Sequence, residues 1–155
     1  MSGTVKRKRI VIPFIFSAST DLEASAGEVF AFHENPNNIS RIAPRGLRVV
    51  RVGASPTARQ GEIFTIVVRQ FGVPLHWVGR WENVVPGRLL VDVGVKCPFP
   101  FWRHEHRFEE IGRDRCRMTD RVSVAAPWPG FSLFAGIFLR RMFRERHALT
   151  TEFFR

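Results

Sequence analysis

Histidines and aromatic residues alternate with charged residues in the segment 102–108, WRHEHRF. This alternation is typical of a β-strand, because successive side chains of a strand point to opposite faces. The two histidines, His104 and His106, then share one face with the aromatic residues, and the charged residues take the other face. Imidazoles among aromatic rings can contact a ligand in an apolar pocket, transfer a proton or bind a metal ion.

The residues that follow supply a partner strand. Residues 112–114, GRD, form a short turn between two alternating runs, and this pattern predicts a β-hairpin. Folding about the turn sets His106 opposite Asp120 on the aromatic face. It sets Glu105 opposite Arg121 on the other face, where we expect a solvent-side ion pair. The same register gives three further inward pairs: Phe108 with Met118, His104 with Val122, and Trp102 with Val124. A slip of one residue would reverse both faces.

Three interpretations of His104, His106 and Asp120 remain open from these residues alone. Asp120 can orient His106 in a buried hydrogen-bond network that only holds the strands in register. The cluster can instead be the polar contact at one end of an apolar ligand pocket. In a catalytic version, His106 is a general base whose tautomer Asp120 fixes and whose basicity Asp120 raises.

A metal site is a fourth interpretation, because His-x-His on one strand and a carboxylate across from it can bind a divalent cation. The chain has three more histidines, and they are candidate third ligands only if the fold brings them close: His33, His76 and His147. We expect ligand contact rather than a metal here, and no cofactor is predicted.

Turn residues divide most of the chain into short segments that alternate in hydrophobicity. We expect a first strand at residues 14–22 and six more strands at residues 47–52, 63–71, 75–84, 89–96, 101–111 and 115–125. Their short connections favour antiparallel neighbours. Trp77, Gly79 and Trp81 share one face of their strand, which is typical of a core or of a pocket wall.

Helices are expected at three places. Ser25 and Glu28 have capping-box spacing, and Asn35-Pro36 is a helix start with its own cap. Residues from about 131 onward have helical periodicity, with Arg140 and other arginines on one side. The apolar side of this long amphipathic helix is predicted to contain Phe131, Phe134, Phe138, Met142, Leu149 and Phe153.

Size and charge restrict the function class. A chain of 155 residues can bury one full core, and its fifteen Phe and four Trp with no Tyr would give bulky apolar walls. The net charge of +10 gathers at the two termini, and no basic stripe with interleaved aromatics crosses the middle, so we do not expect nucleic-acid binding. Four basic residues near the N-terminus predict peripheral contact with an anionic membrane: Lys6, Arg7, Lys8 and Arg9.

The two cysteines and the hydropathy pattern bear on location. Cys97 and Cys116 fall near opposite ends of the predicted hairpin, about 25–30 Å apart, which is too far for a disulfide. No apolar run reaches a membrane span of about 20 residues, and residues 10–16 lack the features of a signal peptide. We therefore expect a soluble cytoplasmic protein.

The element order and five short motifs resemble the START-like superfamily, which includes the Bet v 1-type and polyketide cyclase/dehydrase-like (SRPBCC) proteins. The motifs are EVFAF at 28–32, NPNNI at 35–39, PLHW at 74–77, WRHEHRF at 102–108 and MTDRV at 118–122. The resemblance is closest to uncharacterised bacterial members thought to bind ligands. It covers residues 14–155 as one domain and leaves residues 1–13 as a basic arm.

The resemblance implies an α+β helix-grip fold, in which a curved antiparallel sheet of about seven strands wraps around the long C-terminal helix. Two short helices follow the first strand. It also implies an apolar internal cavity that binds or carries a small hydrophobic ligand such as a lipid, quinone or polyketide, without catalysis. The alternative is a cyclase, dehydratase or isomerase in which His106 and Asp120 are catalytic. Predicted ligand contacts are Trp77, Trp81, Trp102, His104, His106, Phe108, Asp120, Val122, Phe134 and Phe138.

Overall fold

The structure, a computed structural model, describes residues 13–125 and 130–155. Its seven strands are β1 (Phe14–Leu22), β2 (Leu47–Gly53), β3 (Ile63–Gln70), β4 (Val73–Val85), β5 (Leu89–Lys96), β6 (Phe101–Gly112) and β7 (Arg115–Ala125). They form one antiparallel sheet in the order β1-β7-β6-β5-β4-β3-β2. The predicted basic arm, including Lys6 to Arg9, lies outside the described residues.

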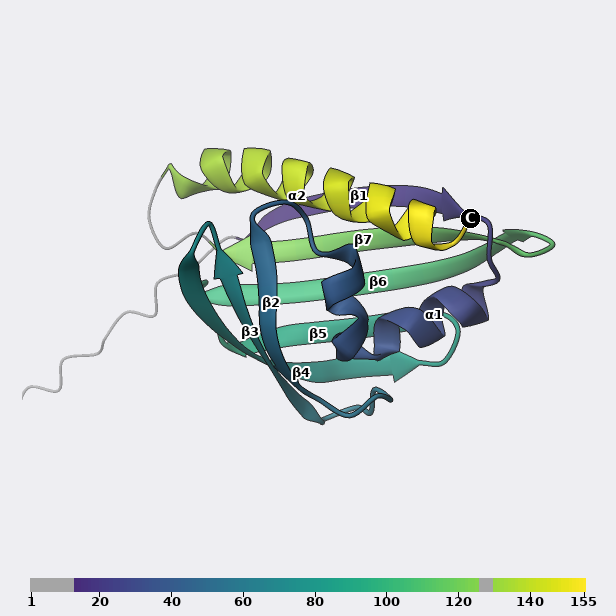
Figure 1. Cartoon of the computed structure of the whole chain (residues 1–155), viewed down its shortest axis with the longest axis horizontal. Coiled ribbons are helices and arrows are strands. Elements are labelled where there is room, and N and C mark those ends of the chain that lie inside the picture. Colours follow the sequence, from purple (N-terminus) through teal and green to yellow (C-terminus); the bar gives the residue numbers. More distant parts are fainter. Residues whose placement is uncertain (1–12, 126–129) are drawn as a thin grey trace, which may run out of the picture.

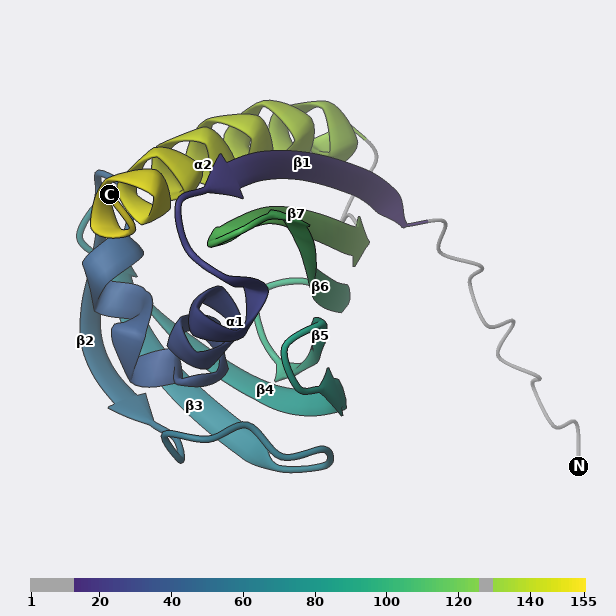
Figure 2. The same cartoon turned by 90° about the vertical axis from the view of Figure 1, so that its right-hand side faces the viewer.

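The sheet curls around the helices, as the helix-grip prediction requires (Figure 1). The long helix α2 (Phe131–Phe153) runs beside edge strand β1, while α1 (Ala26–Glu34) lies inside the curve (Figure 2). A 3-10 helix, η1 (Pro36–Ile42), follows α1 and packs against α2. None of the described helices combines the length and the apolar character needed to cross a membrane.

The register of the β6–β7 hairpin is the predicted one. His106 lies opposite Asp120 and His104 opposite Val122, so the polar cluster forms on the concave face as expected. Both cysteines are free thiols, also as expected.

Glu105 departs from its prediction. It is only 5% exposed, and its carboxylate contacts Arg103 at 3.0 Å and Arg107 at 2.5 Å. The expected ion pair with Arg121 across the hairpin is not formed. Residues two apart on a strand share a face, so the two arginines beside Glu105 take both carboxylate oxygens and cover it.

The short helices begin where the sequence places them. The Ser25 hydroxyl accepts a hydrogen bond from the Glu28 amide, and the Glu28 carboxylate accepts one from the Ser25 amide, which completes the capping box. Asn35 caps η1 through the Asn37 amide. The capping residues therefore fix the chain direction just before the segment that carries His33.

The buried face of α2 differs from the predicted apolar stripe. The most buried side chains of this helix belong to Ala135, Leu139, Phe143, His147 and Thr150. Phe134 was expected to face the interior but is 64% exposed, and Phe138 is only half-buried. The helix is rotated because small residues face the strand, with Gly136 close to the Phe14 ring on β1. The prediction chose the buried face of the helix by hydrophobicity alone, and this criterion favours large apolar side chains over small ones.

Two apolar cores fill the concave face. The first lies under α1 and includes Phe30, Phe64, Trp81, Leu90, Phe108 and Met118. The second lies under α2 and includes Phe16, Trp102, Val122, Val124, Leu139 and Phe143. A belt of buried polar side chains separates them, since His104 and His106 stand between Trp102 and Phe108 on β6. Gly79 leaves no open space in the first core, because the ring of Phe64 fills the volume beside it.

Candidate functional site

Asp120 is the centre of the polar belt, and its side chain is fully buried. Its Oδ1 lies 2.9 Å from Nε2 of His104, and its Oδ2 lies 2.6 Å from Nε2 of His147 on α2. Nδ1 of His106 is 2.6 Å from Oδ1 but is not oriented for a hydrogen bond. One carboxylate thus ties β6, β7 and the C-terminal helix together.

His33, on α1, approaches the belt from the other side. Its ring centre is 5.5 Å from that of His106. Its Nδ1 lies 2.8 Å from the carbonyl oxygen of Val29, so in the neutral ring Nδ1–H donates and Nε2 is the acceptor. That Nε2 is buried and has no hydrogen-bond partner.

Arg146 brings a positive charge to the belt from α2. Its guanidinium carbon is 5.9 Å from the ring centre of Phe143, and its Nε is buried without a hydrogen-bond partner. That Phe143 ring also adjoins the rings of His104 and His147. Burial lowers the pKa of His33, His104 and His106, and the positive charge of Arg146 lowers it further. The belt therefore contains an unpaired donor, Arg146 Nε–H, and an unpaired acceptor, His33 Nε2.

Asp92 adds a second buried carboxylate. It lies opposite His104 on β5, and its Oδ2 is 3.7 Å from Nδ1 of His104. Burial raises its pKa to about 6, although His106, Arg146 and a hydrogen bond from Trp102 act in the other direction. Asp92 was not predicted as a site residue.

Burial sets the charge states of the belt. It lowers the pKa of His33 to about 3 and that of His106, with help from His104, to about 4. The pKa of His104 is also lowered, mainly by burial. Burial alone would raise the pKa of Asp120, but His106, His104 and His147 together hold it well below its usual value. At neutral pH an ionised Asp120 therefore faces neutral His104 and His106. The predicted rise in His106 basicity does not occur, because burial outweighs the nearby carboxylate.

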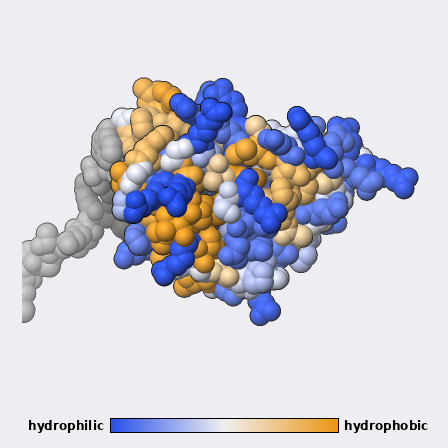
Figure 3. Space-filling model, in the orientation of Figure 1, coloured by the Kyte–Doolittle hydropathy of each residue, from blue (hydrophilic) through white to orange (hydrophobic). Residues whose placement is uncertain are grey.

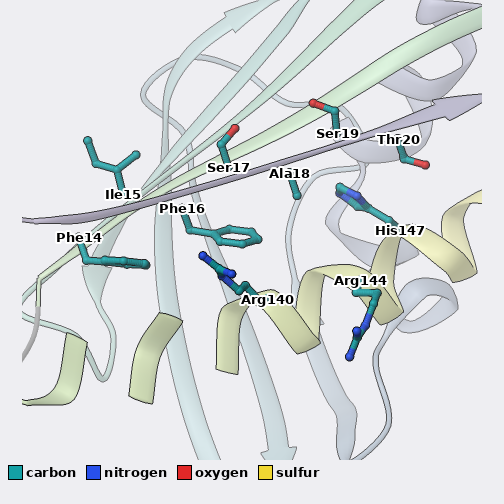
Figure 4. Close-up of a pocket in the computed structure, with 10 residues that line it drawn as sticks. All are labelled: Phe14, Ile15, Phe16, Ser17, Ala18, Ser19, Thr20, Arg140, Arg144 and His147. Carbon is teal, nitrogen blue, oxygen red and sulfur yellow. The ribbon is translucent and has the colours of Figure 1, made fainter. Parts of the chain in front are cut away.

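Two surface hollows approach the belt from opposite sides. A groove of about 570 Å³ runs between β1 and α2. Figure 4 shows β1 along one wall, with His147 reaching from α2 toward the strand and Arg144 pointing away from it. A second hollow of about 520 Å³ lies beside the start of α1 and is lined partly by Phe108. Phe108 contacts the rings of His33 and His106, so it separates this hollow from the belt.

The structure brings most of the predicted contact residues together. Trp77 and Trp102 pack edge to face at 4.9 Å, and Trp102 adjoins His104. Trp81 and Val122 are buried in the two cores. Among the predicted contacts, Phe108 lines the second described hollow and none lines the groove beside β1. Their role in ligand binding stays a prediction.

Sequence reasoning missed Asp92 and Arg146 and left the other histidines undecided. His33 and His147 join the belt, whereas His76 is exposed on β4. A signal was present for Asp92, because it is the one carboxylate in the alternating apolar strand 89–96. No local pattern identified Arg146, which resembles the surface arginines around it.

Residues 22–148 match the family described as "Polyketide cyclase / dehydrase and lipid transport". The chain belongs to this family. The match confirms the predicted START-like relationship and spans the whole polar belt and most of both apolar cores. No curated protein sequence matches the chain.

Solved structures share the fold at low sequence identity. The di-domain aromatase/cyclase BexL of the BE-7585A biosynthetic pathway has a TM-score of 0.73 and 18% identity, covering 90% of this chain and 45% of that one. The aromatase/cyclase Zhui from Streptomyces sp. R1128 has a TM-score of 0.67 and 13% identity, covering 90% of each chain. A START superfamily protein from Mycobacterium smegmatis has a TM-score of 0.65 and 12% identity, covering 89% of this chain and 97% of that one.

Proposed function

We propose that the protein binds a small, largely apolar molecule that carries a hydroxyl group, beside the polar belt and between the sheet and α2. The observation that carries this proposal concerns two of the three buried, unpartnered atoms in the belt, His33 Nε2 and Arg146 Nε. A buried polar atom without a partner costs about 1–3 kcal/mol, and a ligand hydroxyl can donate to one and accept from the other. The aromatic cores on both sides of the belt would contact the apolar part of the ligand.

Charge states favour binding over catalysis by His106. A general base that works near neutral pH needs a pKa close to that pH, whereas the pKa of His106 is lowered to about 4. The shared family and the two aromatase/cyclase structures are compatible with either role.

A matched pair of probes tests the proposal. Naphthalene and 2-naphthol differ only in the hydroxyl, and binding of each is measured through quenching of the tryptophans. We expect 2-naphthol to bind about 10-fold more tightly, which corresponds to about 1.4 kcal/mol. His33→Phe and Arg146→Met should each remove most of this preference. Arg144→Met is the control, because Arg144 lines the groove beside β1.

Each outcome of this experiment is informative. Equal binding of the two probes by the unmodified chain would refute a polar contact for the hydroxyl. Loss of the preference in Arg144→Met but not in Arg146→Met would place the ligand in the groove and refute the site beside the belt. Native mass spectrometry of gently purified protein, followed by solvent extraction, would then identify the natural ligand.

The second candidate function is a cyclase, dehydratase or isomerase, and one observation favours a different base for it. His147 lines the groove beside β1 and also contacts Asp120 at 2.6 Å, so it is a carboxylate-oriented imidazole at an accessible surface. His147→Asn should abolish turnover of an aromatic carbonyl substrate, while His106→Asn should leave it. Turnover that survives in His147→Asn would exclude this role.

A further inference from the structure

We infer that Asp92, His104 and His106 form a binding site for a divalent transition-metal cation. One carboxylate oxygen of Asp92 and one ring nitrogen of each histidine lie within 4.8 Å of one another. All three residues are buried, at 5–7% exposure. The inference does not rest on the proposed ligand function.

Asp120 orients one of the two imidazoles for this site. Its Oδ1 accepts a hydrogen bond from Nε2 of His104 at 2.9 Å, and it lies 2.6 Å from Nδ1 of His106 without hydrogen-bond geometry. When Nε2 of His104 carries the proton, the free lone pair of this ring is on Nδ1, which faces Asp92. Metal-binding histidines usually donate their other N–H to a carboxylate, which fixes the tautomer and raises the affinity. Asp120 is therefore a positioning residue for His104 rather than a ligand.

The spacing between Asp92 and His104 also favours a shared cation. Their nearest side-chain atoms are 3.7 Å apart, which is beyond hydrogen-bond distance. Two ligands of one tetrahedral cation, with metal bonds of about 2.0–2.1 Å, lie about 3.3 Å apart. The Asp92–His104 pair is thus close to the spacing of two ligands of one cation, whereas the ligand atoms of the full set lie within 4.8 Å and would have to draw closer to share it.

Charge provides a separate argument. Asp92 and Asp120 are two buried carboxylates within one belt. Among the described residues, the ion-pair contact that Asp92 makes is to His104, and it is long. An ionised carboxylate that is buried without a close cation costs several kcal/mol. A dication beside Asp92 would offset this cost directly and would also lie near Asp120.

The donor set indicates the class of metal. Two imidazole nitrogens and one carboxylate oxygen suit Zn²⁺, Fe²⁺ or Co²⁺, whereas Ca²⁺ and Mg²⁺ prefer oxygen ligands. Three protein ligands leave at least one coordination position for water or for an oxygen of a bound molecule.

Zinc titration of the full-length chain, stripped with EDTA, tests the site. We expect one Zn²⁺ per chain by calorimetry and by elemental analysis after gel filtration. Asp92→Asn should weaken binding at least about 100-fold, and Asp120→Asn about 10–100-fold. His76→Asn is the control, because His76 is exposed on β4 and is not part of the cluster, so its loss should leave the affinity unchanged.

Thermal melts in EDTA should show that Asp92→Asn is as stable as the unmodified chain, so that weaker binding reports lost coordination. Should that variant not fold, Co²⁺ bound to the unmodified chain decides. Intense four- or five-coordinate visible bands, with paramagnetically shifted imidazole protons, would support the site. A six-coordinate, water-like cobalt spectrum, the absence of stoichiometric Zn²⁺, or Zn²⁺ binding unchanged in Asp92→Asn would overturn it.

Discussion

Replacing Asp120 with alanine should destabilise the fold more than replacing Glu105 with alanine, although each change removes one buried carboxylate. The two residues lie on opposite faces of the same hairpin. Asp120 faces inward and is fully buried, and the histidines that it contacts are 5–7% exposed. Glu105 faces outward and is covered by Arg103 and Arg107, whose side chains are 33% and 56% exposed.

The expected magnitudes follow from what each substitution leaves behind. Asp120→Ala breaks the hydrogen bonds to His104 and His147 and leaves two buried nitrogens unsatisfied, at about 1–3 kcal/mol each, so we expect a loss of about 2–6 kcal/mol. In Glu105→Ala the two arginines can turn to water, and exposed ion pairs contribute about 0.2–1 kcal/mol each, so we expect a loss of about 0.5–2 kcal/mol.

Urea unfolding, followed by circular dichroism and tryptophan fluorescence in the presence of EDTA, measures both free energies of unfolding. Asp120→Asn is included because it retains the side-chain volume and should fold even if the alanine variant does not. A loss in Glu105→Ala equal to or greater than that in Asp120→Ala would refute the reasoning. It would mean that the inward hydrogen bonds contribute little and that the belt does not hold the hairpin to α2.

Three further predictions concern the belt, the first core and the basic arm. Because the pKa of His33 is about 3 in the folded chain and about 6.5 when unfolded, the unfolded state binds more protons between these values. Stability should therefore fall by up to about 1.4 kcal/mol per pH unit below pH 6.5, and urea melts from about pH 7.5 to about pH 5 should be less pH-dependent in His33→Gln. Gly79→Ala should cost about 1–3 kcal/mol in thermal melts by overlapping the ring of Phe64, whereas Gly27→Ala, with open space, should cost nothing; equal effects would contradict the packing. Removing residues 1–9 should weaken co-sedimentation with anionic vesicles, and unchanged binding would show that the arm does not contribute to membrane contact.

Exposed apolar side chains on α2 are a second candidate contact with vesicles. Leu133, Phe134 and Ile137 are all more than 60% exposed near the start of this helix. Figure 3 shows apolar surface over this half of α2, interrupted by hydrophilic side chains. Binding that persists without the arm but is lost in Phe134→Ser would assign membrane contact to α2 alone.

The sheet could be predicted from the sequence because each strand carries the same local signals, alternating hydrophobicity and turn residues at its ends. Alternation with period two identified the strands, and Gly112 and its neighbours fixed the register that sets His106 opposite Asp120. The largest boundary difference is at the β3–β4 turn. Phe71 and Gly72 form the turn with positive φ, and Pro74 belongs to β4. A proline is tolerated there because β5 does not extend far enough to pair with it.

Local sequence signals do not determine how α2 is rotated about its axis. Its existence follows from helical periodicity, but its rotation depends on which residues fit closely against β1. Gly136 approaches the strand because it is small, and Ala135 beside it is buried, so Phe134 is turned outward. Hydrophobicity ranks residues by type, whereas packing selects them by shape.

Local patterns in the sequence were enough to predict the fold, the hairpin register and the placement of His104, His106 and Asp120 on one inner face. The residues that complete the belt became identifiable once the elements were packed together: His33 from α1, Asp92 from β5, and Arg146 and His147 from α2. Their distance along the chain explains this. Strand alternation and turn chemistry act between near neighbours, whereas contacts across the sheet depend on its curvature and on the rotation of a helix, which all of the packed residues set together.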